Sequence, residues 1–225
     1  MTGFDLLPFV ALGALVGLDV VSFPQMMISR PLVAATVAGA LAGDAMRGLL
    51  IGVVLEMVAL GTLPFGASRY PEWGSASVAG GALYATGSAA PAGHLALATL
   101  AALLAAWLSG ESMVWLRKLN AHWARDARAA LDTGRGGVVV SLQLRGLVAD
   151  FVRGGFVVAL ALGALSPVYR LLGARWTGGV ASERTVLAGL TAALGGATIW
   201  MLVRGTPGAR YCIGLGIAAA AALML

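Results

Sequence analysis

The sequence predicts an all-α, polytopic integral membrane protein, and its composition carries most of that prediction. Of 225 residues, 59% are hydrophobic and only 11% are charged, whereas globular domains are about 45–50% apolar and about 25% charged. Glycine contributes 32 residues, well above its usual share of about 7%, which is typical of closely packed membrane helices. A soluble fold could not hide so much apolar surface, and a disordered chain has the opposite composition.

The formal net charge of +5 indicates topology rather than a nucleic-acid partner. The basic residues form no stripe on a soluble fold, and basic loops of membrane proteins mark the cytoplasmic side. We therefore expect the chain to contact a lipid membrane and no nucleic acid. The N-terminus lacks a basic n-region, so we expect residues 6–21 to form the first membrane segment rather than a cleavable signal peptide.

Several apolar segments are shorter than the roughly 20 residues that a full membrane span requires. Short, glycine-interrupted segments are typical of discontinuous or re-entrant helices around a substrate site near the membrane midplane. For residues 32–63 the alternative is a helical hairpin with its charged turn at the surface, and spacing alone favours neither. Residues 76–108 form either one long element or two. The apolar segments are 6–21, 32–43, 48–63, 76–108, 138–149, 154–168, 186–203 and 211–225.

Residues 109–137 are the longest polar stretch and are predicted to form an amphipathic cytoplasmic helix. Trp115, Leu119 and Trp123 recur every four residues, and the basic side chains lie mostly off that stripe. Such a helix suits a membrane interface, and its excess of basic residues places it in the cytoplasm by the positive-inside rule. It is either a surface linker or a docking site for a soluble partner.

This segment divides a single membrane domain, residues 1–225, into a first half, 1–108, and a second half, 138–225. A short D-x-x-R-G motif recurs in both halves, at residues 44–48 and 150–154. Internal repeats are a hallmark of transporters, so this echo favours an inverted-repeat transporter architecture. The alternative is two ordinary ion pairs on helix surfaces.

Glu56 is the most prominent candidate site residue because it lies alone inside an apolar run, residues 53–60. A carboxylate at membrane depth is costly and faces a cavity or a partner. It would bind a hydroxylated ligand or a proton. The alternative is a structural ion pair with an arginine from another helix. Asp19 is a further acid in an apolar segment, with no stronger indication of a role.

A second cluster contains Gln25, Ser29, Arg30 and Pro31, directly after Pro24. Two prolines interrupt helix here, and irregular backbone at membrane depth is tolerated only where it is buried in protein or lines a cavity. Sugar hydroxyls need paired donors and acceptors, which glutamine, arginine and carboxylates supply. The alternative is an interfacial loop whose arginine contacts lipid head groups.

The sequence carries no signature of a soluble enzyme. It has no Cys/His cluster with metal-ligand spacing and neither a P-loop nor a Gly-x-Ser-x-Gly motif. His94 is interpreted as a solvated loop histidine, and His122 lies on the basic helix. Cys212 lies in an apolar run and is interpreted as packing. We therefore expect no catalytic residue, no metal site and no cofactor.

Residues 25–72 resemble the enzyme IIC subunit of mannose/fructose/sorbose-type, phosphoenolpyruvate-dependent sugar phosphotransferase systems. The matching pieces keep their order and spacing without gaps over this stretch, although the family commonly has Asp where this chain has Glu72. The pieces are residues 28–34, 43–44, 48–52, 55–57, 60–61, 65–67 and 71–72. Within them, the motif positions are Arg30, Pro31, Gly43, Asp44, Gly48, Glu56, Gly66, Pro71 and Glu72.

The resemblance implies a sugar-translocating, multi-pass subunit of the bacterial inner membrane. In that family IIC pairs with a IID membrane subunit, and the pair forms a larger oligomer. Soluble IIA and IIB subunits carry phosphoryl groups from phosphoenolpyruvate on histidines and phosphorylate the hexose as it emerges, so IIC itself is not a phosphocarrier. The chain ends at Leu225 in an apolar run and is shorter than typical members, so we expect a final helix of the family to be missing.

We expect Gln25, Arg30, Asp44 and Glu56 to line a polar cavity between broken helices. Glu56 would accept hydrogen bonds from the hydroxyls of a hexose, and Arg30 and Gln25 would donate them. One alternative is a non-transporting scaffold or sensor that docks phosphocarrier proteins through its basic segment, residues 111–135. Another is an unrelated secondary transporter that uses Asp44 or Glu56 for protons.

Overall fold

The computed structural model describes residues 4–62, 69–87 and 91–176, together with scattered positions between 185 and 211. Across these residues the chain is helical and contains no β-strand, which confirms the all-α class. Gly66, Cys212 and most of the last two apolar segments lie outside the described residues. The elements are η1 (Phe4–Leu6), α1 (Leu7–Asp19), α2 (Pro31–Leu41), α3 (Ala45–Ala59), α4 (Trp73–Ala85), α5 (Pro91–Asp126), α6 (Arg128–Asp132) and α7 (Gly136–Ala174).

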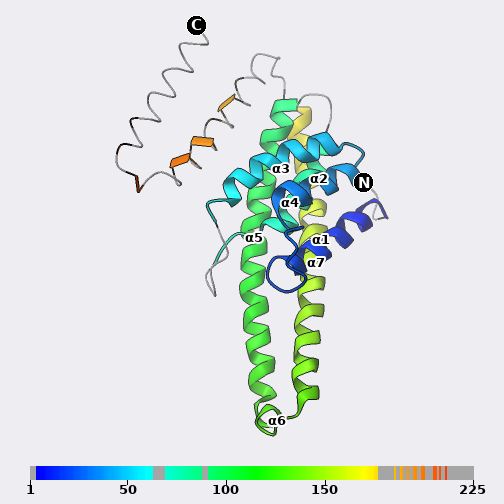
Figure 1. Cartoon of the computed structure of the whole chain (residues 1–225). Coiled ribbons are helices and arrows are strands. Elements are labelled where there is room, and N and C mark those ends of the chain that lie inside the picture. The colour runs from blue at the N-terminus through cyan, green and yellow to red at the C-terminus, as the bar shows by residue number, and fades with distance from the viewer. Residues whose placement is uncertain are drawn as a thin grey trace.

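Two long helices, α5 and α7, run side by side, and the short helices α1–α4 pack around one end of them (Figure 1). With 36 and 39 residues, α5 and α7 are about 54 and 58 Å long at 1.5 Å per residue. Among the described residues, these two helices alone are long and apolar enough to cross a membrane. The short helices have 11 to 15 residues, which is less than a full span.

The polar segment 109–137 differs from its expected form as a separate surface helix. Residues 109–126 continue α5 without a break, and α7 begins at Gly136. Together with α6 they form a helical projection away from the short helices, residues 113–149, which we call the arm (Figure 1). Trp115 and Leu119 of the apolar stripe are exposed, at 69% and 41%, and the boundary expected at residue 108 lies inside α5. Residues 76–108 belong to two helices, α4 and α5.

Residues 31–59 form two short helices, α2 and α3, which pack against each other as a helical hairpin. Gly43, with φ +95°, ends α2 in the left-handed conformation that glycine adopts readily. Gly39 and Gly48 let the two backbones touch, since a Cβ on Gly48 would lie 2.4 Å from the carbonyl oxygen of Ala35. The side chain of Asp44 accepts a hydrogen bond from the backbone N–H of Arg47 and caps α3.

Helix α4 lies at the centre of the short-helix bundle, and every one of its residues is buried. It contacts α1, α2, α3, α5 and α7. Small residues allow this close packing on all sides: a Cβ on Gly81 would lie 2.5 Å from the carbonyl oxygen of Ala35 in α2. The core therefore holds the N-terminal end of α4, near Trp73, in a fixed place between the other helices.

Candidate functional site

A cleft of about 590 Å³ opens at the N-terminal end of α4, within the roughly 300–1,000 Å³ range of small-molecule sites. One wall is the irregular loop 20–30 with the start of α2, and another is residues 70–74 at the start of α4. Ala59 and Thr62, at the end of α3, complete it. Of the residues expected at a site, Gln25, Arg30, Pro31 and Pro71 line this cleft.

Asp19 holds the loop in place from the C-terminal end of α1. Its side chain is only 2% exposed, and one carboxylate oxygen accepts from the backbone N–H of Met26 at 2.6 Å. The other oxygen accepts from both the backbone N–H and the hydroxyl of Ser29, at 2.9 and 2.8 Å. A buried carboxylate with three donors replaces the helical partners that the loop backbone lacks.

Two loop residues that face the cleft, Gln25 and Met27, have positive φ values of 59° and 63°. Side chains disfavour this region of backbone space, and non-glycine residues in it cost of order 1–3 kcal/mol each. Such residues persist where surrounding contacts fix them, and they cluster at ligand sites. The contacts from Asp19 to either side of Met27 are contacts of that kind.

Arg30 and Glu56 form an ion pair between the start of α2 and the last turns of α3. The other oxygen of Glu56 accepts from the backbone N–H of Leu32 at 3.2 Å, near the N-terminus of α2. The side chains are 33% and 19% exposed, so the pair is half-buried at the edge of the cleft. This arrangement is the arginine pairing considered as the alternative for Glu56, and it directs the carboxylate to the residue that lines the cleft.

The wall at residues 70–74 is aromatic. Trp73 lines the cleft, and its indole N–H donates to the hydroxyl of Thr62 at 2.7 Å. Tyr70 also lines the cleft, and the guanidinium of Arg117 lies 5.1 Å from the centre of its ring, within cation–π range. The cleft thus combines flat apolar faces with a few polar groups, as ligand pockets do.

Glu72 is the N-cap of α4 and is fully buried, at 0% exposure. One carboxylate oxygen accepts from the backbone N–H of Ser75 at 3.0 Å, and the other accepts from the hydroxyl of Ser109 in α5. A guanidinium nitrogen of Arg153 lies 3.8 Å away. The sequence marked Glu72 as a motif position, and the structure shows that its carboxylate fixes the start of the helix behind the cleft.

Neither Asp44 nor Glu56 lines the cleft with Gln25 and Arg30, but Glu56 is paired with Arg30 and Asp44 is not near it. Asp44 begins α3 whereas Glu56 lies near the other end, and 12 residues of helix separate them by about 18 Å. Its carboxylate caps α3 and pairs with Arg47 at 3.3 Å, while Arg47 also donates to the carbonyl oxygen of Gly87 at 2.7 Å. A capping aspartate and a cavity-lining aspartate look alike in a single sequence.

The two histidines occupy different environments. His122 is exposed on the arm and lies 3.3 Å from Asp126. His94, expected in a solvated loop, is instead buried in α5 and packs edge-on against Tyr169, with ring centres 5.5 Å apart. The interpretation of His94 as solvated was therefore wrong, because α5 begins before it and α7 covers it. No group of metal-ligating side chains occurs among the described residues.

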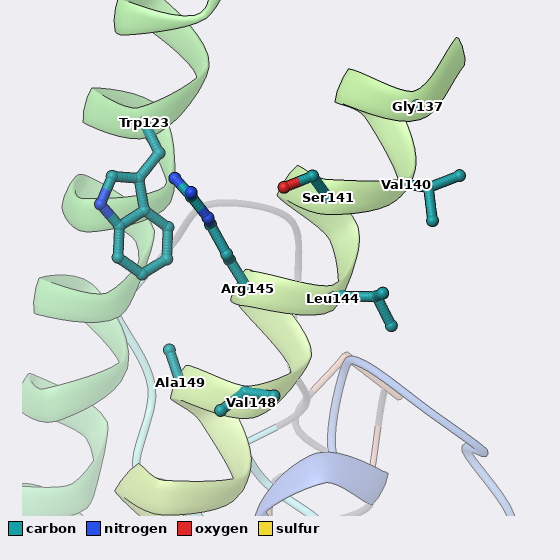
Figure 2. A pocket seen from close by; sticks show the side chains of 8 residues that line it. All are labelled: Trp123, Gly137, Val140, Ser141, Leu144, Arg145, Val148 and Ala149. Carbon is teal, nitrogen blue, oxygen red and sulfur yellow. The ribbon is translucent and has the colours of Figure 1, made fainter.

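A second cavity, of about 610 Å³, lies on the arm between α5 and α7. Figure 2 shows that Arg145 extends from α7 toward Trp123 of α5, whereas Val140 and Leu144 point to the other side. None of the site residues expected from the sequence lines this cavity. It offers one charged side chain beside apolar surface, which suits hydrogen bonding to a sugar less well than the first cleft does.

Sequence reasoning missed three contributors to the site. Asp19 carried no particular indication, although an acid five residues before Pro24, where the helix is interrupted, was the available signal. Asp150 and Arg153 were noted only as part of a repeated motif, yet both are buried in α7 beside Glu72. Apart from the pair that they form with each other, their partners are more than 40 residues away in the chain, beyond the reach of any local pattern.

Comparison with known proteins gives one family and several relatives. The family model of the sorbose-specific IIC component of PTS systems matches residues 6–225. The chain is 29% identical over 153 residues to the mannose-specific EIIC component of Escherichia coli K12, covering 67% of this chain and 56% of that protein. It is 38% identical over 74 residues to the sorbose-specific EIIC component of Klebsiella pneumoniae, covering 33% of this chain and 28% of that protein. The chain thus spans about half the length of the first of these relatives.

Two solved structures share the fold. One, described as a membrane protein, matches with a TM-score of 0.72 at 22% identity, over 98% of this chain and 87% of that chain. The other is the mannose transporter ManYZ in complex with microcin E492, with a TM-score of 0.61 at 24% identity, over 97% of this chain and 87% of that chain. The helical arrangement in Figure 1 is therefore that of known membrane proteins.

Proposed function

Because the chain belongs to the family of sorbose-specific IIC components of PTS systems, we propose that it is the sugar-translocating subunit of a mannose-type phosphotransferase system. It moves a hexose across the bacterial inner membrane as a multi-pass protein. The observation that carries this proposal is the cleft at the start of α4, which combines an aromatic wall with Gln25 and Arg30. The family supplies the substrate class, and the cleft supplies a place for it.

The cleft suits a hexose in size and in chemistry. Gln25 offers both a donor and an acceptor, Arg30 offers several donors, and the Glu56 carboxylate accepts. Trp73 presents an apolar face against which the C–H face of a sugar ring packs. Hydroxyl groups of the sugar form hydrogen bonds with both members of the Arg30–Glu56 ion pair. The pair therefore provides a polar edge that is already oriented before the ligand arrives.

Transport requires the cleft to open in turn to each side of the membrane. The hairpin α2–α3 is too short for a span and acts as a re-entrant element that carries one wall of the cleft. The two D-x-x-R-G motifs support an inverted repeat. Each forms an i,i+3 ion pair, and each places its glycine at a close helix crossing, Gly48 against α2 and Gly154 against α1.

The partners follow from the family. A IID membrane subunit completes the transporter, and the pair forms a larger oligomer. Soluble IIA and IIB subunits supply the phosphoryl group, so the chain needs no phosphocarrier residue of its own. Of the two histidines, His94 is buried against Tyr169, and His122 lies 3.3 Å from Asp126 on the arm.

Substitution of Glu56 tests the proposal in vesicles that carry the full set of subunits. Uptake of labelled hexose driven by phosphoenolpyruvate falls at least tenfold in Glu56→Gln and is lost in Glu56→Ala, since hydrogen bonds to a charged group are worth about 1.5–3 kcal/mol. Assembly with IID stays intact, because the pair is only half-buried. Normal uptake by a well-assembled Glu56→Ala variant would contradict the assignment.

Glu111→Gln is the matched control. Glu111 pairs with Arg69 at 3.2 Å in an ion pair on the surface, and neither residue lines the cleft. Exposed pairs of this kind contribute about 0–1 kcal/mol, so uptake by this variant stays at the wild-type level. Uptake that follows an ion gradient rather than phosphoenolpyruvate would instead favour a secondary transporter.

A further inference from the structure

A cluster of buried polar side chains lies behind the cleft and touches both of its walls. Glu72 is 0% exposed, Asp150 is 1% exposed and Arg153 is 9% exposed. We call these three residues, together with the exposed Ser22 that contacts Asp150, the buried clamp. None of them lines the cleft. Charged groups at this depth are costly unless they are paired, so their arrangement needs a reason beyond packing.

The first half of the buried clamp reaches the loop wall. The Nε atom of Arg153 donates to one oxygen of Asp150 at 2.9 Å, one turn earlier in α7. The other oxygen of Asp150 accepts from the hydroxyl of Ser22. Ser22 belongs to the loop that continues to Gln25 and Met27, so α7 is tied directly to the segment that lines one side of the cleft.

The second half reaches the aromatic wall. The Nη1 atom of Arg153 donates to the hydroxyls of Ser109 and Ser112 in α5, each at 3.2 Å. It also lies 3.8 Å from a carboxylate oxygen of Glu72, which accepts from Ser109. Glu72 caps α4 immediately before Trp73, so the same guanidinium is tied to the other side of the cleft.

We propose that Arg153 and Asp150 are positioning residues, which set the separation of the two cleft walls and thereby the affinity for sugar. The proposal rests on the proposed function. The guanidinium of Arg153 is a planar fork, and its Nε atom faces one wall while its Nη1 atom faces the other. Lysine places its charge at a single point and cannot serve both. The remaining Nη2 atom is buried without a partner beside Gly17 of α1, so the guanidinium has little freedom to turn.

Arg153→Lys tests the fork while it keeps the charge. We measure hexose uptake by the complete transporter over a range of sugar concentrations. The KM rises about tenfold, the change expected when one charge-assisted hydrogen bond is lost, whereas the maximal rate per assembled complex stays within about twofold. An unchanged KM in an assembled variant would overturn the proposal, and so would a loss confined to the maximal rate.

Arg145→Lys is the matched control, because Arg145 lies on the same helix but is exposed on the arm (Figure 2). It forms no hydrogen bond or ion pair among the described residues, and its KM stays unchanged. A milder variant, Ser22→Ala, breaks only the contact between Asp150 and the loop. It raises KM several-fold with normal assembly, and a wild-type KM for this variant counts against the proposal even if Arg153→Lys fails to fold.

A measurement without sugar separates this proposal from the proposed function. Met27 is exposed and lines the cleft, so we introduce Met27→Cys in a Cys212→Ser background and follow the rate of maleimide labelling. Adding Ser22→Ala or Arg153→Lys raises the rate, while Arg145→Lys does not. Equal rates in all variants would overturn the clamp. Faster labelling in a complex that takes up no hexose would support the clamp and overturn the sugar assignment.

Discussion

Asp19→Asn removes the charge that organises the cleft loop without changing the size of the side chain. In the structure, one carboxylate oxygen serves the backbone N–H of Met26, and the other serves the N–H and hydroxyl of Ser29. An asparagine has a single acceptor oxygen, so whichever way its amide turns, an NH₂ group faces at least one backbone N–H. That buried donor is left without a partner.

The size of the effect follows from this geometry. An unsatisfied buried donor costs about 1–3 kcal/mol, and Gln25 and Met27 already hold strained positive φ values that the Asp19 contacts maintain. A loss of about 2 kcal/mol lowers the ratio of ordered to disordered loop by roughly 30-fold. If only the ordered loop binds sugar, the apparent Kd rises by up to about 30-fold.

Equilibrium binding of labelled hexose to the purified, fully assembled transporter measures this change. Asp132→Asn is the control, because Asp132 is an exposed residue of α6 on the arm, and its Kd stays at the wild-type value. A wild-type Kd for Asp19→Asn, in protein that elutes as the intact complex, would refute the reasoning. It would mean either that the loop is ordered without Asp19 or that the sugar binds elsewhere.

Three further substitutions separate stability from binding. Gly48→Ala places a Cβ 2.4 Å from a backbone oxygen of α2, at a cost of about 1–3 kcal/mol, and lowers the melting temperature of the complex in detergent. The control Gly163→Ala meets open space and leaves the melting temperature unchanged. Asp44→Ala removes the α3 cap and the pairing with Arg47, and it costs about 1 kcal/mol of stability while the Kd for hexose is unchanged. Trp73→Phe removes a donor that lies 2.7 Å from a threonine hydroxyl beside the cleft, and the Kd for hexose rises while assembly is normal.

Local features of the chain could be predicted from the sequence because they depend on residues that are close together in it. Prolines interrupt helix wherever they fall inside it, and the irregular segment between α1 and α2 ends at Pro31, as the cluster around Arg30 indicated. The glycines of α1 and of the α2–α3 hairpin lie at close helix crossings. Composition was sufficient for the all-α class. Each of these inferences needed only neighbours within a few turns.

Features that depend on partners far away in the chain could not be predicted from the sequence. The hydroxyl of Ser22 reaches Asp150, 128 residues away, and Arg153 reaches Ser109, 44 residues away. An Asp–Arg pair at i,i+3 looks the same on a helix surface as in a core, so burial of Asp150 and Arg153 followed only from the packing of α1, α4 and α5 against α7. His94 shows the converse error: the Pro-Ala-Gly segment before it indicated a solvated loop, whereas tertiary packing buries the side chain.

The polar segment 109–137 shows a third limit. Its four-residue apolar stripe was recognised, but a stripe does not say whether it faces lipid or another helix. In the structure, residues 109–126 extend α5, and α7 returns beside them (Figure 1). The backbone hydrogen bonds of α5 continue where its composition changes from apolar to polar. The boundary that composition predicted at residue 108 therefore has no counterpart in the backbone.

The position of a bound hexose tests the central claim most directly. We would determine the structure of the complete transporter by electron cryo-microscopy with saturating sugar. The account predicts density between loop 20–30 and residues 70–74, with the ring against Trp73 and hydroxyl groups near Arg30 and Glu56. Density at the start of α3 beside Asp44, or in the arm cavity beside Arg145, with the cleft at the start of α4 empty, would contradict it.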